Sequence, residues 1–187
     1  VIPSPQEYGY RNHARFTVGP EGNLGFVNRE TRRFIRIDHC MLMHTGVNRL
    51  LEQLQGHCAE TSQLSIRAGE ETGGYLVQPT LVDWGIPVAT GQKSYLDSVD
   101  GKPFRISSPS FFQVNTLQAE RMIDIILEKL NPRGDEILVD AYSGIGTFAI
   151  MLAPMMGKVV GIEESSSAIK DARANAEGME EVDFLQG

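Results

Sequence analysis

The stretch Ile137-Leu-Val-Asp-Ala-Tyr-Ser-Gly-Ile-Gly-Thr-Phe148 decides the fold class of the second half of the chain. Its apolar run 137–139 ends in Asp140 and is typical of a strand that is buried on both faces of a parallel sheet. Residues 144–153 then predict a loop that enters a helix. Glycines at 144 and 146 allow close approach of the backbone to a ligand, because a Cβ atom would occupy the ligand's space or forbid the backbone angles. We therefore expect a ligand-binding loop at the carboxyl edge of the sheet.

Strands and helices alternate on both sides of this loop. The predicted elements are a helix from Asn115 or Thr116 to Leu130, the strand 137–140, a helix after Gly144, a strand at 159–163, a helix at 166–177 and a strand from Val182. A capping residue begins the first helix, and Asn-Pro-Arg-Gly at 131–134 ends it. This alternation predicts a parallel, doubly wound sheet of the α/β, Rossmann-like class.

The nature of the ligand follows from three positions around the loop. Glu163 ends the next strand about 20 residues on, where a carboxylate can accept hydrogen bonds from both ribose hydroxyls of a nucleotide. The third glycine of the dinucleotide pattern is replaced by Ala149, and that glycine belongs to sites that hold a pyrophosphate. The acidic Asp140 suits a cationic ligand without phosphate. These features favour S-adenosylmethionine, and a dinucleotide enzyme or a degenerate loop are the alternatives.

The first half of the chain has a different pattern. Short β-rich segments, broken by Gly, Pro and Asn, are predicted as strands at 14–18, 24–28, 33–37, 63–67, 75–79 and 94–99. Between them, residues 39–55 have the apolar spacing of one helix face and end at Gly56. The chain is thus predicted as a central α+β domain with an antiparallel sheet, residues 1–107, followed by the first part of an α/β methyltransferase domain, residues 108–187.

Composition narrows the class of protein. The 187 residues are 41% hydrophobic, with no targeting segment and no apolar run long enough to span a membrane, so we expect a cytoplasmic protein. The two cysteines, Cys40 and Cys58, make a disulfide framework improbable. The net charge of −7 argues against coating of nucleic acid, although residues 1–37 hold six arginines and only three glutamates. A basic N-terminal face on an acidic body fits a protein that contacts phosphate in one place, and a solvated strand surface is the alternative.

Two motifs together resemble one family. Ser108-Pro-Ser-Phe-Phe-Gln-Val-Asn115, followed by a helix and then Leu138-Val-Asp-Ala-Tyr-Ser-Gly-Ile-Gly-Thr-Phe148, looks like the RNA uracil-C5 methyltransferases that make 5-methyluridine in 23S rRNA or tRNA. Ile2-Pro-Ser-Pro5 and Tyr8-Gly-Tyr-Arg-Asn12 resemble the central domain of the same family. The resemblance spans nearly the whole chain and implies methylation of uridine C5 in RNA. It favours 23S rRNA over tRNA as the substrate.

The resemblance also implies roles for single residues. Gln113 would contact S-adenosylmethionine, Tyr142 would lie beside its methionine portion, and Glu163 would hold the ribose. The remaining cofactor-binding residues would line the loop, namely Gly144, Gly146 and Thr147. Phe111 or Phe112 would stack on a flipped-out base, and core packing is the alternative for one of the two.

Some family features have no counterpart in this chain. The family adds a cysteine thiolate to C6 of uracil and removes the C5 proton with a base, and both residues lie downstream of the third strand. No catalytic residue is assigned, and we expect a fragment that is inactive alone. Cys40 resembles the fourth ligand of a [4Fe–4S] cluster in several members, which would exist only in the full-length protein. The alternative function is a non-catalytic RNA-binding or assembly module that retains the fold.

Overall fold

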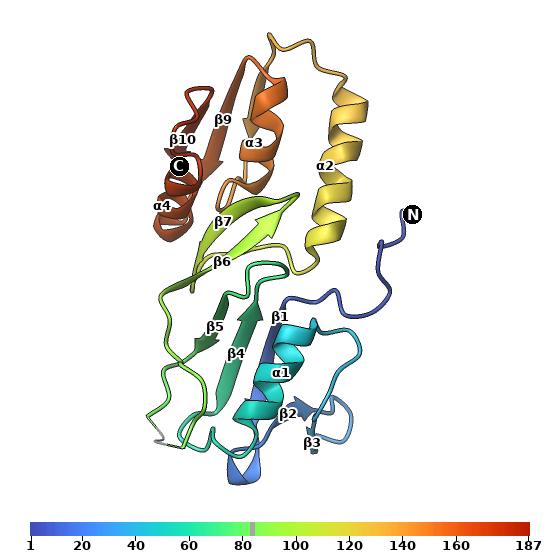
Figure 1. Ribbon diagram of the computed structural model, residues 1–187, viewed down its shortest axis with the longest axis vertical. Coiled ribbons are helices and arrows are strands. Elements are labelled where there is room, and N and C mark those ends of the chain that lie inside the picture. The colour runs from blue at the N-terminus through green and yellow to red at the C-terminus, as the bar shows by residue number, and fades with distance from the viewer. Residues whose placement is uncertain (83–84) are drawn as a thin grey trace. The chain divides into compact units, whose positions relative to one another are not determined.

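The computed structural model describes residues 1–82 and 85–187, and these residues divide into two compact units (Figure 1). Unit 1 is Val1–Tyr95 and unit 2 is Leu96–Gly187. The predicted boundary between residues 107 and 108 falls inside unit 2. The reason is that β7 (Lys102–Ser107) packs against α4 (Ser166–Asn175), a contact between segments far apart in the sequence.

Unit 1 contains a five-stranded sheet in the order β3-β2-β1-β4-β5. Its strands are β1 (His13–Val18), β2 (Leu24–Val27), β3 (Phe34–Arg36), β4 (Gln63–Ala68) and β5 (Tyr75–Gln78). All four pairings are antiparallel, so the predicted antiparallel sheet is confirmed. The bounds of all five strands agree with the predicted ranges to within one residue at each end.

The core of unit 1 lies between this sheet and α1 (Thr45–Leu54). The helix begins later than the predicted residue 39, because His44 acts as its N-cap and accepts a hydrogen bond from the Gly46 N–H. Alternate strand residues such as Phe16 and Leu64 are fully buried against the apolar face of the helix. The predicted helix face is confirmed for Val47, Leu50, Leu51 and Leu54, which are all buried. Met43 was predicted on the same face and is also buried, but it precedes the helix.

A two-stranded sheet is formed by β6 (Ser94–Val99) and β7, and the sequence analysis missed β7. The turn between these strands is Asp100-Gly101, and both residues have positive φ angles, 49° and 71°. Asp-Gly is the dipeptide typical of a tight two-residue hairpin turn, so a local signal was present. Phe104 and Ile106 of β7 are fully buried.

Unit 2 continues with α2 (Thr116–Leu130) and a three-stranded parallel sheet in the order β10-β9-β8. Its remaining elements are β8 (Ile137–Asp140), α3 (Thr147–Leu152), β9 (Lys158–Glu163), α4 and β10 (Val182–Gln186). The predicted capping of α2 is confirmed, because the Asn115 side chain accepts a hydrogen bond from the Gln118 N–H at 3.0 Å. Among the described residues, no helix is long and apolar enough to cross a membrane.

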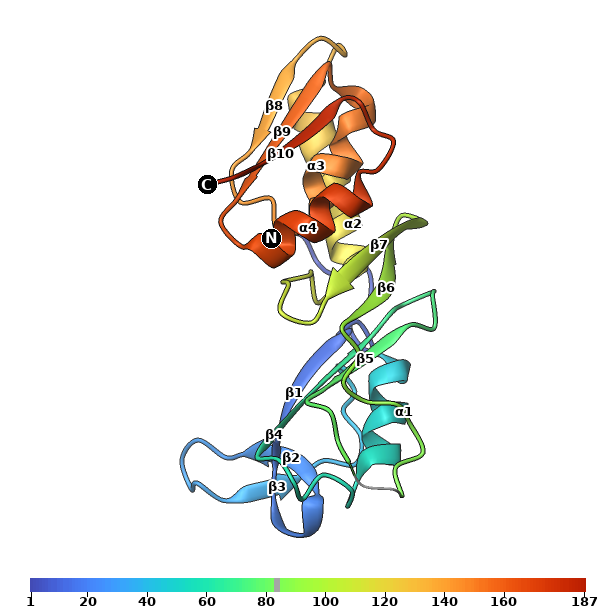
Figure 2. The same cartoon turned by 90° about the vertical axis from the view of Figure 1, so that its left-hand side faces the viewer.

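Two expectations about this sheet differ from the structure. β8 is not buried on both faces, since Ile137 is 72% and Val139 is 56% exposed. The doubly wound arrangement is not found within residues 96–187, where α2, α3 and α4 lie on the same face of the sheet (Figure 2). The chain passes from β8 to β9 and from β9 to β10 in the same direction across the sheet. Because such crossovers between parallel strands are right-handed, α3 and α4 lie on the same face.

Candidate functional site

The candidate site lies at the carboxyl edge of the unit 2 sheet, in the loop from β8 to α3. Gly144 has a φ angle of 55°, and a Cβ atom built on it would meet nothing within 4 Å, so its surface is open. Gly146 has a φ angle of 85°, and a Cβ atom there would lie 2.6 Å from Cζ of Phe184. Gly144 therefore leaves room beside the loop, whereas Gly146 is required by packing inside the domain.

Glu163 connects the two loops that follow β8 and β9. Its Oε2 atom accepts a hydrogen bond from the Gly144 N–H at 3.0 Å, and its Oε1 atom accepts one from the Ser165 N–H at 2.8 Å. The Ser143 N–H also donates to the Ile162 carbonyl at 3.0 Å. Each carboxylate oxygen can accept a further hydrogen bond. Glu163 thus holds the glycine loop in place and still has acceptor capacity for a ligand.

A pocket of about 340 Å³ opens beside these loops. Tyr142 and Glu163, which the sequence analysis singled out, both line it, and the Tyr142 side chain is 93% exposed. Ala141 and Glu164 also line the pocket and were not predicted. The sequence did contain a signal for these two residues, because each directly follows an acid that ends a strand. Residues that follow parallel strands meet at the carboxyl edge of the sheet.

Asp140 has a buried oxygen, Oδ2, with no hydrogen-bond partner among the described residues. Burial raises the pKa of Asp140 above its ordinary value, nearby backbone N–H groups of Tyr142 and Ala149 act to lower it, and the charge of Glu163 raises it. A buried acceptor without a donor is costly, and a bound cation or N–H donor would remove that cost. These two carboxylates fit a positively charged ligand such as S-adenosylmethionine, and they would repel a diphosphate.

Two other predicted site residues, Thr147 and Gln113, are not among the residues that line this pocket. Thr147 is buried at the first position of α3. Gln113 is half-buried in the segment between β7 and α2, and it is not one of the residues that line the pocket. Of the two adjacent phenylalanines, Phe112 is buried at 5% exposure, whereas Phe111 is 66% exposed. Core packing therefore applies to Phe112, and Phe111 is the one available for stacking.

Cys40 lies in unit 1 and is partly buried. Its backbone N–H donates to Oδ1 of Asn48 at 2.9 Å, and its carbonyl accepts from Nδ2 of the same residue at 3.0 Å. Within residues 1–82 and 85–187, no group of three or more His, Cys, Asp or Glu side chains could hold a metal ion. Cys58 is fully buried and its thiol donates to the Leu54 carbonyl, as expected of a packing residue.

Comparison with known sequences points to one family. Residues 94–186 match the family model described as tRNA (Uracil-5-)-methyltransferase. An uncharacterized RNA methyltransferase of Streptomyces avermitilis is 26% identical over 210 residues, which cover 100% of this chain and 48% of that protein. Another from Oceanobacillus iheyensis is 40% identical over 121 residues, which cover 63% of this chain and 25% of the relative. The chain spans about half the length of the first of these relatives.

Comparison with solved structures supports the fold. The crystal structure of a Pyrococcus abyssi tRNA (uracil-54, C5)-methyltransferase in complex with S-adenosyl-L-homocysteine matches with a TM-score of 0.81 and 23% identity. The match covers 100% of this chain and 57% of that one. At this identity the likeness establishes a shared mixed α/β, methyltransferase-like fold.

Proposed function

Because this chain belongs to the RNA uracil-C5 methyltransferase family, we propose that its protein transfers a methyl group from S-adenosylmethionine to C5 of a uridine in RNA. Unit 2 binds the cofactor at the carboxyl edge of β8 and β9. The observation that carries this proposal is the pair of carboxylates at that edge: half-buried Asp140, whose Oδ2 atom has no hydrogen-bond partner among the described residues, and the loop-bridging Glu163.

Each residue of the site has a distinct task in this proposal. Glu163 accepts hydrogen bonds from the ribose while its two existing bonds keep the loops in place. Asp140 balances the positive charge of the ligand in a partly desolvated position, where electrostatic attraction is stronger than in water. Tyr142, which lines the pocket, would contact the methionine portion, and Gly144 leaves the loop surface open. S-adenosylmethionine supplies an activated methyl group when it is bound.

The steps on the base are assigned to residues outside this chain. Uracil C5 needs a thiolate added at C6 to become nucleophilic enough, followed by a base that removes the C5 proton. Cys58 is fully buried, and Cys40 is not among the residues that line the cofactor pocket. Exposed Phe111 is the residue of this chain that we propose for stacking on the target base.

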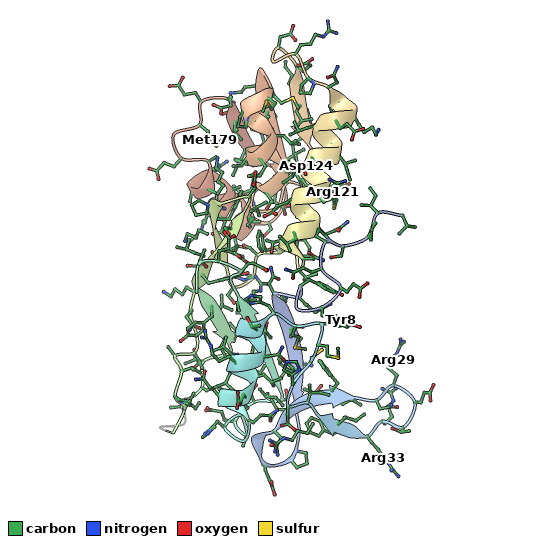
Figure 3. All side chains as sticks on the ribbon, turned by 45° about the vertical axis from the view of Figure 1, so that its right-hand side comes forward. Tyr8, Arg29, Arg33, Arg121, Asp124 and Met179 are labelled. Carbon is green, nitrogen blue, oxygen red and sulfur yellow. The ribbon has the colours of Figure 1, made fainter. Side chains whose placement is uncertain are left out.

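RNA contact by unit 1 is supported by the loop between β2 and β3, here called the arginine hairpin (residues 28–33). Arg29, Arg32 and Arg33 are exposed and form no ion pair with the described residues. In Figure 3 the side chains of Arg29 and Arg33 point outward from the sheet. Unpaired arginines on a protruding hairpin suit contact with phosphates.

The class of RNA is the finer part of the proposal. The motifs of the sequence favour 23S rRNA, whereas the matched family model and the Pyrococcus abyssi structure are named for tRNA. Incubation of the intact protein with radiolabelled S-adenosylmethionine and either unmodified tRNA or a 23S rRNA transcript separates the two. Label in 5-methyluridine from 23S rRNA alone supports our proposal, and label from tRNA alone contradicts it.

Calorimetry with S-adenosylhomocysteine tests the cofactor site. We expect the intact protein to bind, and Glu163→Ala to weaken binding roughly tenfold to a hundredfold, because hydrogen bonds to a charged group are lost. Glu177→Ala is the matched control, since Glu177 is exposed near the end of α4 and does not line the pocket. Absence of binding to the intact protein, with RNA binding retained, would favour the non-catalytic RNA-binding module instead.

A further inference from the structure

A buried carboxylate on α4 holds the segment that leads into α2. Asp171 is fully buried and accepts hydrogen bonds from the Arg105 guanidinium, which also forms an ion pair with it. It further accepts from the Ser107 N–H at 2.8 Å, the Ser107 hydroxyl at 2.7 Å and the Ser110 hydroxyl at 2.8 Å. One side chain thus fixes three residues that lie more than 60 positions earlier in the chain.

Asn175 lies one turn further along α4 and extends this contact to the glycine loop. Its side-chain oxygen accepts from the Arg105 N–H at 2.8 Å, and its Nδ2 donates to the Arg105 carbonyl at 3.1 Å. The same Nδ2 donates to the Ile145 carbonyl at 3.2 Å. Asp171 and Asn175, here called the α4 clamp, therefore hold the end of β7, the start of segment 107–115 and the loop after β8 on one helix face.

The α4 clamp is an unusual choice for packing alone. The remainder of the inner face of α4 is apolar, with Ala168, Ile169 and Ala172 all buried. Burial of a carboxylate costs free energy, whereas burial of an apolar side chain of similar size does not. The advantage of Asp171 is therefore that it holds its hydrogen-bond partners in a defined geometry. Those partners precede Gln113 by only a few residues. An acid on the apolar face of the predicted helix was a sequence signal that we did not use.

We propose that Asp171 is a positioning residue for the cofactor site. By fixing Ser107 and Ser110, it sets where Gln113 and exposed Phe111 lie relative to the glycine loop, which Asn175 holds from the same helix. This inference rests on the proposed function, because Gln113 matters only if the pocket binds S-adenosylmethionine. Asp171 does not line the pocket, and under this proposal it acts on the pocket through segment 107–115.

The test combines two variants and two measurements on the intact protein. Asp171→Asn keeps the shape of the side chain but removes its charge, and Ser110→Ala removes one hydroxyl while leaving the Arg105 ion pair in place. Calorimetry measures the affinity for S-adenosylhomocysteine. Amide hydrogen exchange measures the order of residues 107–115 against the rest of unit 2.

Two controls separate positioning from general destabilisation. Ile123→Val removes a buried methylene from α2, outside the α4 clamp, and is expected to lower the melting temperature of unit 2. Asp124→Asn makes the same charge change at an exposed position of α2 (Figure 3). Both controls are expected to bind S-adenosylhomocysteine as the unmodified protein does.

We expect Asp171→Asn and Ser110→Ala each to weaken S-adenosylhomocysteine binding by about tenfold and to speed exchange selectively in residues 107–115. Unchanged affinity in both variants overturns the proposal. It is also overturned if Ile123→Val, compared at an equal loss of melting temperature, weakens binding as much. Failure of the proposed function looks different, because then the unmodified protein does not bind S-adenosylhomocysteine at all, and both proposals fall together.

Discussion

The pKa of His13 on β1 departs strongly from its ordinary value. Burial lowers its pKa from 6.5 to about 4, and the neighbouring charges of Arg67, Arg11 and Arg15 contribute in the same direction. Its Nε2 atom lies 2.9 Å from the hydroxyl of Ser65 on β4. The neutral imidazole is thus the form that fits this sheet, among positive charges that disfavour protonation.

This environment predicts acid sensitivity of unit 1. The unfolded chain takes up a proton on His13 near pH 6.5, whereas the folded chain does so only near pH 4. The contribution of neutral His13 to the free energy of unfolding is therefore fully present above pH 6.5 and is lost as the pH falls toward 4. We expect His13→Gln to reduce this loss by on the order of 1 kcal/mol, a figure discounted because the side chain is only half-buried. Urea unfolding at pH 7 and pH 4.5 measures it, with exposed His39→Gln as the control. Equal pH dependence in both variants would contradict the prediction.

At the scale of the element, the arginine hairpin is a well-ordered protrusion. Oδ1 of Asn28 accepts hydrogen bonds from the N–H groups of Glu30 and Thr31 at 3.0 and 2.9 Å. The Asn28 N–H donates to the Arg33 carbonyl at 2.9 Å, which closes the loop. Arg32 has a φ angle of 57°, so its replacement would mix backbone effects with the loss of charge. Arg29 and Arg33 are the better positions for a test.

Replacement of these two arginines should weaken RNA binding without changing which RNA is preferred. Phosphate contacts carry no sequence information, and each one lost lowers the salt dependence of binding by about one unit of slope. We expect Arg29→Gln with Arg33→Gln to reduce the slope of log K against log salt by about two. Filter binding across a salt series measures this. The matched control is Arg121→Gln with Arg133→Gln, two exposed arginines of unit 2, and an equal effect of both pairs would refute a special role for the hairpin.

At the scale of the whole molecule, the two units have separate tasks. Unit 1 has a continuous core of its own, between its five-stranded sheet and α1. Every residue that lines the candidate cofactor pocket belongs to unit 2, as does every member of the α4 clamp. The proposed cofactor site therefore lies within residues 96–187, and the proposed RNA contact of the arginine hairpin lies within residues 1–95.

This division predicts where a bound ligand protects the chain. A ligand that contacts only the folded state slows local opening of the groups around it. We expect saturating S-adenosylhomocysteine to slow amide exchange around residues 141–147 and 163–165 and to leave β1 and α1 unchanged. Hydrogen exchange with mass spectrometry measures both regions in one sample. Protection of β4 or α1 equal to that of the glycine loop would contradict the prediction.

Elements with strong local signals could be predicted closely from the sequence. The bounds of α2 and its Asn115 cap agree with the structure, because capping and apolar periodicity act within a few residues. The parallel strands and the glycine loop were predicted from the same kind of pattern. By contrast, β7 was missed despite its Asp-Gly turn, and β8 was wrongly expected to be buried on both faces.

The sequence by itself determined the antiparallel sheet of the first half, the parallel sheet of the second half and the place of the glycine loop, because each depends on residues close together in the chain. Only the tertiary structure decided that Phe112 rather than Phe111 is buried, that Gly146 is required by Phe184, and that Asp171 organises segment 107–115. Burial and hydrogen-bond partners depend on which distant segments meet. That information is absent from local periodicity and appears only when α4, β7 and the glycine loop pack together.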